Sequence, residues 1–165
     1  LLLIHYLAQA RGIILHACGI VIEDRGILFL GESGAGKSTL ARLWDQENGV
    51  DILSDDRVIV RKQGREFRVY GTPWHGEAAF GSPREARLER IFFLSHGHEN
   101  STKEMTGLDP VARLLICSFP PLWDPKAMEC ALEFFSQIAD HVPFQELSFR
   151  PEKSVLALVK KIIKW

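Results

Sequence analysis

The segment GESGAGKST at residues 31–39 constrains the fold more than any other feature of this chain. It satisfies the pattern G-x-x-x-x-G-K-[ST] of a phosphate-binding loop, in which backbone amides and the N-terminus of the following helix bind an anion. Such a loop requires a strand before it and a helix after it. The apolar run ILFL precedes the segment, and a helical spacing of apolar residues over residues 37–46 follows it. A glycine-rich turn before a helix is the structural alternative.

The residue types in this loop predict binding of ATP with Mg²⁺. Glycines allow backbone N–H groups to turn inward without a Cβ in the way. Lys37 is expected to reach the β and γ phosphates, and the Ser38 hydroxyl is expected to ligate Mg²⁺. The predicted nucleotide-binding residues are Gly31, Glu32, Ser33, Gly34, Ala35, Gly36, Lys37, Ser38 and Thr39.

The run ILSDDR places Asp55 and Asp56 at the end of a predicted buried strand. Adjacent carboxylates repel each other unless a cation or a proton lies between them. Beside a phosphate loop, one carboxylate can ligate Mg²⁺ and the other can accept the proton of an attacking hydroxyl. A turn is the alternative interpretation of two aspartates. The short separation from the loop disfavours ABC-type and RecA-type ATPases, whose acidic strand comes much later, and favours a small phosphoryl-transfer domain.

Composition and charge narrow the function classes further. The chain has 165 residues, 46% of them hydrophobic and 25% charged, which suits one soluble globular domain. The formal net charge of −1 provides no basic field for nucleic acid or an anionic membrane. The run LLLIHYLA is much shorter than the ~20 apolar residues that a spanning helix needs. Because the sequence begins at Leu1 rather than Met, we expect it to be the C-terminal part of a longer chain.

The cysteines indicate the compartment. Cys18, Cys117 and Cys130 are an odd number without C-x-x-C spacing. We interpret them as reduced, mostly buried thiols of a cytoplasmic protein, with a zinc site as the weaker alternative.

Hydrophobic periodicity predicts an α/β domain with a mixed sheet, because the predicted hairpins contribute antiparallel strands to it. A hairpin precedes the phosphate loop, and the C-terminal part is mainly helical. The predicted elements are a helix over 1–11, strands over 12–23 and 27–30, a helix over 37–46, a strand over 50–54, a hairpin of RVIVRK and EFRVYG, a strand over 90–96, a polar loop over 98–103, helices over 109–118 and 125–140, a strand VPFQEL and a helix over 151–164. Asp109 is the expected cap of its helix and Pro110 the expected first helical residue.

The stretch LHACGIVIEDRGILFLGESGAGKSTL, followed by ILSDDRV, resembles the C-terminal catalytic domain of HPr kinase/phosphorylase, a family related in fold to phosphoenolpyruvate carboxykinase. That family has a histidine at the start of the first hairpin strand, then the phosphate loop, then paired aspartates. The matching histidine here is His16. The similarity covers residues 12–60, and a looser likeness extends to about residue 96.

The resemblance implies ATP-dependent phosphorylation of a serine hydroxyl on a protein or peptide. It implies Asp55 as the general base, Ser38 and Asp56 as metal ligands, and His16 near the phosphates or the base. A buried core histidine is the alternative for His16. The family's proline-glycine-arginine-asparagine stretch is replaced here by ELSFRPEKSVLALV. This departure disfavours the phosphorylase reaction, HPr as the substrate and the family's hexamer, and indicates a divergent kinase-like relative. A homo-oligomer of another kind is compatible with the resemblance.

The stretch GTPWHGEAAFG at residues 71–81 is a Gly/Pro-rich loop of the kind that forms the rim of a site. The resemblance gives Glu77 as the nearest candidate for a further metal ligand. His75 is a candidate for orienting substrate or phosphate, and Trp74 fits packing better than stacking on a base. A purely structural loop is the alternative.

Other polar residues favour structural interpretations. The spacing of Arg84, Arg87 and Arg90 predicts a solvated helical face, with phosphate neutralisation as the alternative. His96 and His98 fit a polar loop better than a metal site.

Two other function classes remain. In a small-metabolite kinase the phosphate-loop strand normally opens the domain and an arginine-rich lid covers the site, and neither feature is present. A non-catalytic nucleotide-binding regulator would need no base, so the complete set of Lys37, Ser38, Asp55 and Asp56 disfavours it.

Overall fold

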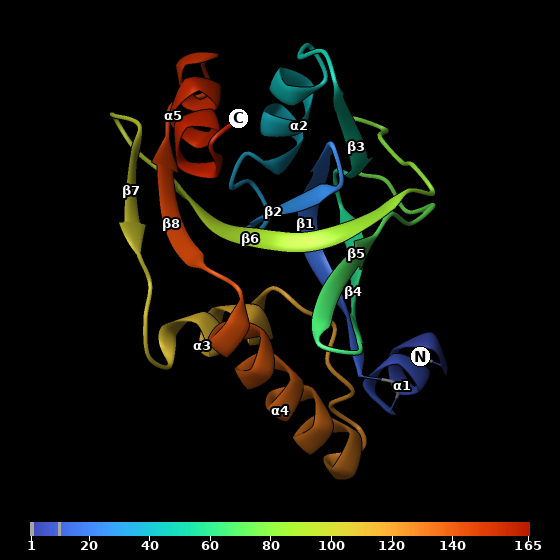
Figure 1. Ribbon diagram of the computed structural model, residues 1–165. Coiled ribbons are helices and arrows are strands. Elements are labelled where there is room, and N and C mark those ends of the chain that lie inside the picture. Colours follow the sequence, from blue (N-terminus) through green and yellow to red (C-terminus); the bar gives the residue numbers. More distant parts are fainter. Residues whose placement is uncertain (1, 10) are drawn as a thin grey trace.

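The computed structural model describes residues 2–9 and 11–165, which form one mixed sheet with helices packed against it (Figure 1). The elements in chain order are α1 (Leu2–Gln9), β1 (Gly12–Ile22), β2 (Arg25–Leu30), α2 (Lys37–Trp44), β3 (Val50–Ser54), β4 (Arg57–Gln63), β5 (Glu66–Tyr70), β6 (Glu85–His96), β7 (Ser101–Glu104), α3 (Asp109–Ile116), α4 (Pro125–His141), β8 (Phe144–Phe149) and α5 (Ser154–Ile163). The predicted α/β class, the mixed sheet and the hairpin before the phosphate loop are confirmed. Residues 1 and 10, which fall in the first predicted helix, lie outside the described residues.

Strand β1 organises the sheet. Its residues are buried except at His16, as expected for an apolar, β-branched strand that is covered on both faces. One edge of β1 pairs antiparallel with β2, where Ala17 lies opposite Leu30. The other edge pairs with two strands in succession, with β4 along its first half and with β3 along its second half.

The strands around β1 close on themselves. The pairings β1–β2, β2–β6, β6–β5, β5–β4 and β4–β1 return to the starting strand, and only β2–β6 among them is parallel. Strands β8 and β7 extend the sheet beyond β6. Closure leaves few free edges near the phosphate loop, which follows the end of β2.

The helices cover two sides of the sheet and bury two apolar clusters. In Figure 1, α2 and α5 lie together at one side, and α3 and α4 lie at the other. The first cluster contains Trp44 of α2 and Val159 of α5, and the second contains Leu114 of α3 and Phe135 of α4. These four side chains are fully buried, each with 0% exposure, so the apolar periodicity of the helices marks their core faces.

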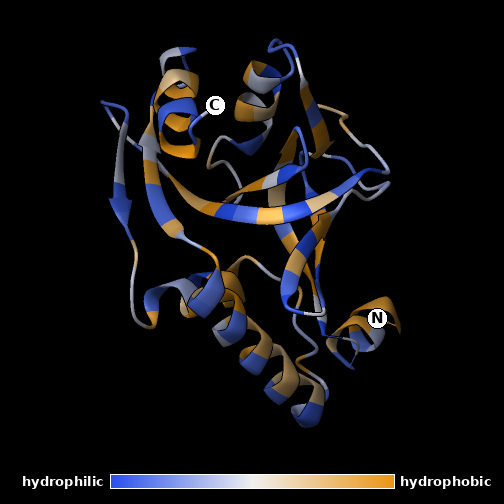
Figure 2. Ribbon diagram, viewed as in Figure 1, coloured by the Kyte–Doolittle hydropathy of each residue, from blue (hydrophilic) through white to orange (hydrophobic). Residues whose placement is uncertain are grey.

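The prediction of a helical face for Arg84, Arg87 and Arg90 is wrong. Residues Glu85–His96 form the single long strand β6, in which buried Ala86 and Leu88 alternate with exposed neighbours. This alternation of hydrophobic and hydrophilic residues is visible along β6 in Figure 2. A period of two was present in the sequence, but the charged residues on the outward face obscured it.

Two smaller predictions also need correction. Leu108, not Asp109, occupies the cap position of α3, and Asp109 and Pro110 open the helix itself. The predicted loop over 98–103 ends in the short strand β7, which pairs antiparallel with β8. Strand β7 lies at the edge of the sheet and is polar, so no apolar pattern marks it.

The three cysteines are free, with Cys18 and Cys117 buried and Cys130 exposed. Across the described parts of the chain, helices lack the length and apolar character needed to cross a bilayer. The expectation of one domain that forms the C-terminal part of a longer chain stays a prediction.

Candidate active site

The sheet places the phosphate loop, His16 and the acidic pair side by side, at neighbouring positions on adjacent strands. Leu30, the last residue of β2, pairs with Ala17 of β1. The Ala17 amide in turn donates a hydrogen bond to the carbonyl of Asp56 at 3.0 Å. Only strand β1 therefore separates the start of the loop from the aspartates. His16 precedes Ala17 on that strand.

The aspartates occupy a break between two strands. Strand β3 ends at Ser54 and β4 begins at Arg57, and both strands pair with the same edge of β1. The buried Ser54 hydroxyl accepts hydrogen bonds from the amides of Asp56 and Arg57 at 3.1 and 3.0 Å. The same hydroxyl donates to the Trp74 carbonyl at 2.8 Å, which ties the loop over residues 71–81 to the break.

The phosphate loop has the backbone conformation that its glycines predict. Gly34 and Gly36 have φ values of +84° and +95°, in the left-handed region that favours glycine. The Lys37 ammonium is buried and donates to the carbonyls of Gly31 and Glu32 at 2.8 and 2.9 Å. Burial lowers the pKa of Lys37 below its ordinary value. The ammonium is thus held against the start of the loop.

Asp55 links the loop to the acidic pair. Its carboxylate accepts the Ser38 hydroxyl at 3.0 Å and the amides of Gly76 and Ala78 at 2.8 and 2.9 Å. Burial of Asp55 opposes ionisation, but hydrogen bonds from Gly76, Ala78, Ser38 and Phe80 outweigh burial and hold the pKa of Asp55 below its ordinary value. Asp55 is therefore a fixed, buried anion at the N-terminus of α2.

Asp56 has a different environment. Its carboxylate lies 3.3 Å from His16 Nε2 and 3.4 Å from Arg57 Nε. Burial lowers the pKa of His16, with Lys37 and Arg57 acting in the same direction and Asp56 opposing them. His16 is accordingly neutral at pH 7, with one ring nitrogen as donor and the other as acceptor.

Most predicted site residues line one cavity of about 260 Å³. These are His16, Ser33, Gly34, Gly36, Lys37, Ser38, Thr39, Asp55, Asp56 and Glu77, together with Arg42 and Gly76. Gly31, Glu32 and Ala35 line a second cavity, which shares Ser33 and Gly34 with the first. The structure therefore divides the predicted nucleotide-binding residues between two adjoining cavities.

The candidates in the loop over residues 71–81 differ in position. Glu77 is exposed at the rim of the first cavity, and its carbonyl accepts a hydrogen bond from Arg42 at 3.3 Å. His75 is exposed and does not line that cavity. Trp74 packs against the Arg57 guanidinium, 6.0 Å from the ring centroid. The role of Glu77 as a metal ligand stays a prediction.

The donor set at the first cavity consists of oxygen atoms, the ligand type that Mg²⁺ prefers. Within residues 2–9 and 11–165, no three His, Cys, Asp or Glu side chains are grouped closely enough to hold a metal ion. Mg²⁺ prefers oxygen ligands, keeps several waters and often uses one or two protein carboxylates together with substrate phosphates. The Ser38 hydroxyl and the carboxylates of Asp55 and Asp56 supply oxygen atoms of this kind at one cavity.

His96 contacts the phosphate loop, and the sequence analysis did not predict this contact. Its Nε2 lies 2.9 Å from the carbonyl of Gly34. The sequence carried no signal for it, because the contact depends on the parallel pairing of β6 with β2, which brings the carboxyl ends of the two strands to one edge of the sheet.

No protein-family model matches this sequence, and no curated protein matches it. Among solved structures, the Hpr(Ser) kinase/phosphatase from Coxiella burnetii matches with a TM-score of 0.50 over 92% of this chain and 88% of that chain. The chain shares the fold of that kinase/phosphatase. The sequence identity is 15%, so the likeness confirms the predicted relationship at the level of fold alone.

The contact between Gly76 and Asp55 yields a testable prediction. A Cβ at Gly76 would lie 2.8 Å from Asp55 Oδ2, so Gly76→Ala must displace the carboxylate. We expect any catalytic rate that depends on this carboxylate to fall on the order of 10²-fold, the cost of a small displacement at a reacting centre. The matched control is Gly81→Ala in the same loop, where the nearest atom is the Thr72 carbonyl oxygen at 3.3 Å. Equal rates for the two variants, in an assay of the activity proposed below, would contradict this role of the loop.

Proposed function

We propose that the protein is an ATP-dependent phosphotransferase that phosphorylates a serine hydroxyl on a protein or peptide. The observation that carries the proposal is the hydrogen bond between Ser38 and Asp55, at 3.0 Å. It joins the N-terminus of the phosphate-loop helix to an ionised carboxylate. The shared fold with an HPr(Ser) kinase/phosphatase supports the proposal.

The residues would hold Mg²⁺ through oxygen atoms. The oxygen atoms of Ser38 and Asp55 lie closest to the phosphate loop, and Glu77 lines the same cavity. When bound with ATP, Mg²⁺ neutralises charge that develops on the phosphoryl oxygens. Lys37 and the amides at the N-terminus of α2 supply further positive charge to the same phosphates.

The hydrogen bonds support different roles for the two aspartates. Asp55 accepts the Ser38 hydroxyl and two amides and has a lowered pKa, which suits a permanently ionised group beside a metal. Asp56 has freer oxygens beside the neutral His16, which suits acceptance of a proton. We therefore propose Asp56 as the base and Asp55 at the metal. The family resemblance implies the reverse assignment, which is the alternative that variants of the two residues distinguish.

The proposed reaction is an in-line displacement. The serine oxygen forms a bond to the γ-phosphorus, and the bond from that phosphorus to the oxygen bridging the β and γ phosphates breaks. The serine proton passes to the Asp56 carboxylate, whose position His16 fixes at 3.3 Å. ADP is the leaving group.

An apolar pocket beside Asp56 supports a polypeptide acceptor over a small polar metabolite. The pocket has a volume of about 280 Å³ and is lined by Leu3, Ile4, Ile14, Arg57, Trp74 and Phe119. The Arg57 guanidinium lies over the rings of Trp74 and Phe119 and also contacts Asp56. An acceptor with an apolar side chain near its hydroxyl can use both the pocket and the base.

The proposal also includes the cellular compartment. The free thiols of Cys18, Cys117 and Cys130 support a reducing compartment such as the cytoplasm, where ATP is available. A small-metabolite kinase and a non-catalytic regulator are the competing functions.

The proposal is tested by offering γ-labelled ATP with degenerate serine-containing peptides and, in parallel, with small hydroxylated metabolites. We expect label in phosphoserine with the wild type and on the order of 10²–10³-fold slower labelling with Lys37→Met. Label in a metabolite would favour the metabolite kinase. ATP binding without transfer to any hydroxyl would favour the regulator.

A further inference from the structure

We infer that His96 and Phe149 are positioning residues that hold two glycines of the phosphate loop in their left-handed conformation. Both residues lie outside the loop, and neither lines the first cavity. They contact the loop and not the reacting groups. The inference rests on the proposed function and adds to it how the loop is ordered before the phosphates of the donor bind.

The parallel part of the sheet brings the two residues together. Strand β6 pairs parallel with β8, and His96 lies opposite Phe149 where both strands end. Strand β6 also pairs parallel with β2, from which the phosphate loop continues. Because the carboxyl ends of parallel strands share one edge of a sheet, the ends of β6 and β8 lie beside the loop.

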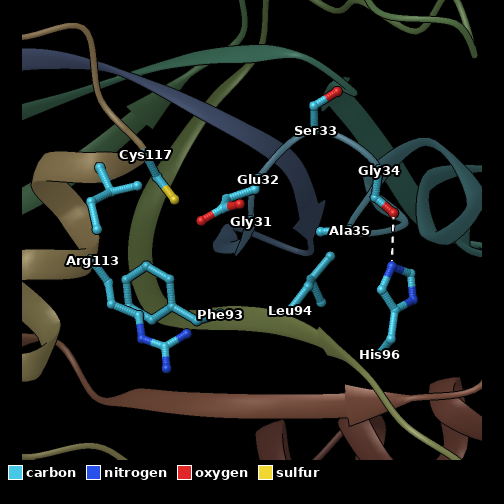
Figure 3. Close-up of a pocket in the computed structure, with 11 residues that line it drawn as sticks. Gly31, Glu32, Ser33, Gly34, Ala35, Phe93, Leu94, His96, Arg113 and Cys117 are labelled. Carbon is cyan, nitrogen blue, oxygen red and sulfur yellow. Dashed lines mark hydrogen bonds between the residues drawn. The ribbon is translucent and has the colours of Figure 1, made fainter.

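His96 fixes the peptide group that follows Gly34. Its Nε2 lies 2.9 Å from the Gly34 carbonyl oxygen, and Figure 3 shows the ring directed at that oxygen. A carbonyl oxygen can only accept, so Nε2 is the donor. The same planar peptide group carries the Ala35 N–H, which points the opposite way and donates to the Glu32 carbonyl at 3.1 Å. This peptide group is therefore held at both ends.

Phe149 supports the loop at Gly36. A Cβ on Gly36 would lie 2.8 Å from Phe149 Cζ, so the ring packs directly against this backbone position. Phe149 is buried in the same apolar cluster as Ala35 and Leu94, and close packing restricts movement of its ring. Gly34 and Gly36, which both have positive φ values, thus each have one contact with the pair.

The support is tied together beyond the ends of the strands. Asn100, which follows β6, accepts the Arg150 amide at 2.8 Å and donates to the Ser154 hydroxyl at 2.8 Å. Arg150 and Ser154 follow β8, so the segments after the two strands are joined. Glycine loses more conformational freedom on ordering than any other residue. Contacts that restrict the glycines within the protein therefore lower the ordering cost of ligand binding.

The first test replaces His96 by Leu and by Gln. Leu has a similar size but no donor, whereas the side-chain amide of Gln can donate to the Gly34 carbonyl. The matched control is His98→Leu, since His98 is also exposed and lines neither cavity. Deuterium exchange of the amides over residues 31–39 measures the order of the loop without ligand, and calorimetry measures Mg·ATP affinity.

We expect His96→Leu to speed exchange in the loop and to weaken Mg·ATP binding about tenfold, because affinity falls with the fraction of molecules whose loop is competent to bind. His96→Gln should stay near the wild type in both measurements, and His98→Leu should change neither.

Three results would overturn the inference and leave the proposed function standing. They are unchanged exchange in His96→Leu, faster exchange with unchanged affinity, and equal loss of affinity in His96→Gln and His96→Leu, which would mean that the imidazole only fills space. A wild type that fails to bind Mg·ATP would overturn both.

A second test examines Phe149 through double variants. Gly34→Ala and Gly36→Ala both place a methyl group at a positive φ, but a Cβ at Gly34 has nothing within 4 Å, whereas one at Gly36 meets the Phe149 ring. Phe149→Leu removes that ring. Losses of Mg·ATP affinity should be less than additive for Gly36→Ala with Phe149→Leu, and additive for Gly34→Ala with Phe149→Leu. Additive losses in both combinations would overturn the role of Phe149.

Discussion

Replacing Asp56 by Asn is expected to lower kcat for phosphoryl transfer by about 10²–10⁴-fold, the range for loss of a general base. The amide keeps the size of the carboxylate but cannot accept the proton of the serine hydroxyl. It also stays close to His16 and Arg57, which hold the native side chain at 3.3 and 3.4 Å. ATP affinity should change little, because Asp56 is proposed to act on the acceptor. Initial rates of phosphoserine formation and calorimetric ATP binding measure the two effects separately.

The comparison variant is Asp55→Asn. Asp55 accepts hydrogen bonds from Ser38, Gly76 and Ala78, so its replacement should affect the bound metal and nucleotide together with the rate. If Asp55→Asn abolishes transfer while it spares Mg·ATP binding, and Asp56→Asn weakens binding instead, the roles are the reverse of those proposed here. That result would restore the assignment implied by the family resemblance.

Replacing Lys37 by Met is expected to reduce kcat/KM on the order of 10²–10³-fold, as for loss of one preorganised charge at a transition state. The unbranched apolar side chain fills a similar volume but removes the ammonium. That ammonium is buried and donates to the carbonyls of Gly31 and Glu32. Those carbonyls lose their donor, so we also expect the free energy of unfolding to fall by about 1–3 kcal/mol.

The control for Lys37→Met is Lys160→Met. Lys160 is half-buried and pairs with Glu47, away from both cavities. Lys160→Met should leave the rate of phosphoryl transfer unchanged. Urea unfolding of both variants shows whether a lower rate comes from lost stability or from lost catalysis. A Lys37→Met protein with wild-type transfer rates would show that the loop does not hold the reacting phosphate.

Local patterns were sufficient to predict most of the fold. The hairpin before residues 31–36 and the helices α2, α4 and α5 each carry their own signal, in turn residues or apolar spacing, and each is present. Strand β6 was predicted only in part, because its first half alternates buried Ala86 and Leu88 with charged residues. Pairing with β5 and β2 makes this segment a strand, and the periodicity of a sequence carries no information on such long-range pairing.

The proximity of the candidate site residues was predictable, but their contacts were not. His16, Lys37, Ser38, Asp55 and Asp56 do line one cavity. What the sequence could not reveal is that two strands share one edge of β1, so that the aspartates fall in the break between them. The second cavity was also hidden, because it combines β6 and α3, which are distant in sequence from the loop.

The most direct measurement of the central claim is the effect of Mg²⁺ on ATP affinity in the wild type and in Asp55→Asn. If Ser38 and Asp55 belong to one metal–nucleotide site, Mg²⁺ should raise ATP affinity about tenfold or more in the wild type, equivalent to about 1.4 kcal/mol, and have little effect in the variant. Binding of metal-free ATP should be similar in the two proteins, which also confirms that the variant is folded. An Asp55→Asn protein that keeps the full Mg²⁺ enhancement would contradict the account.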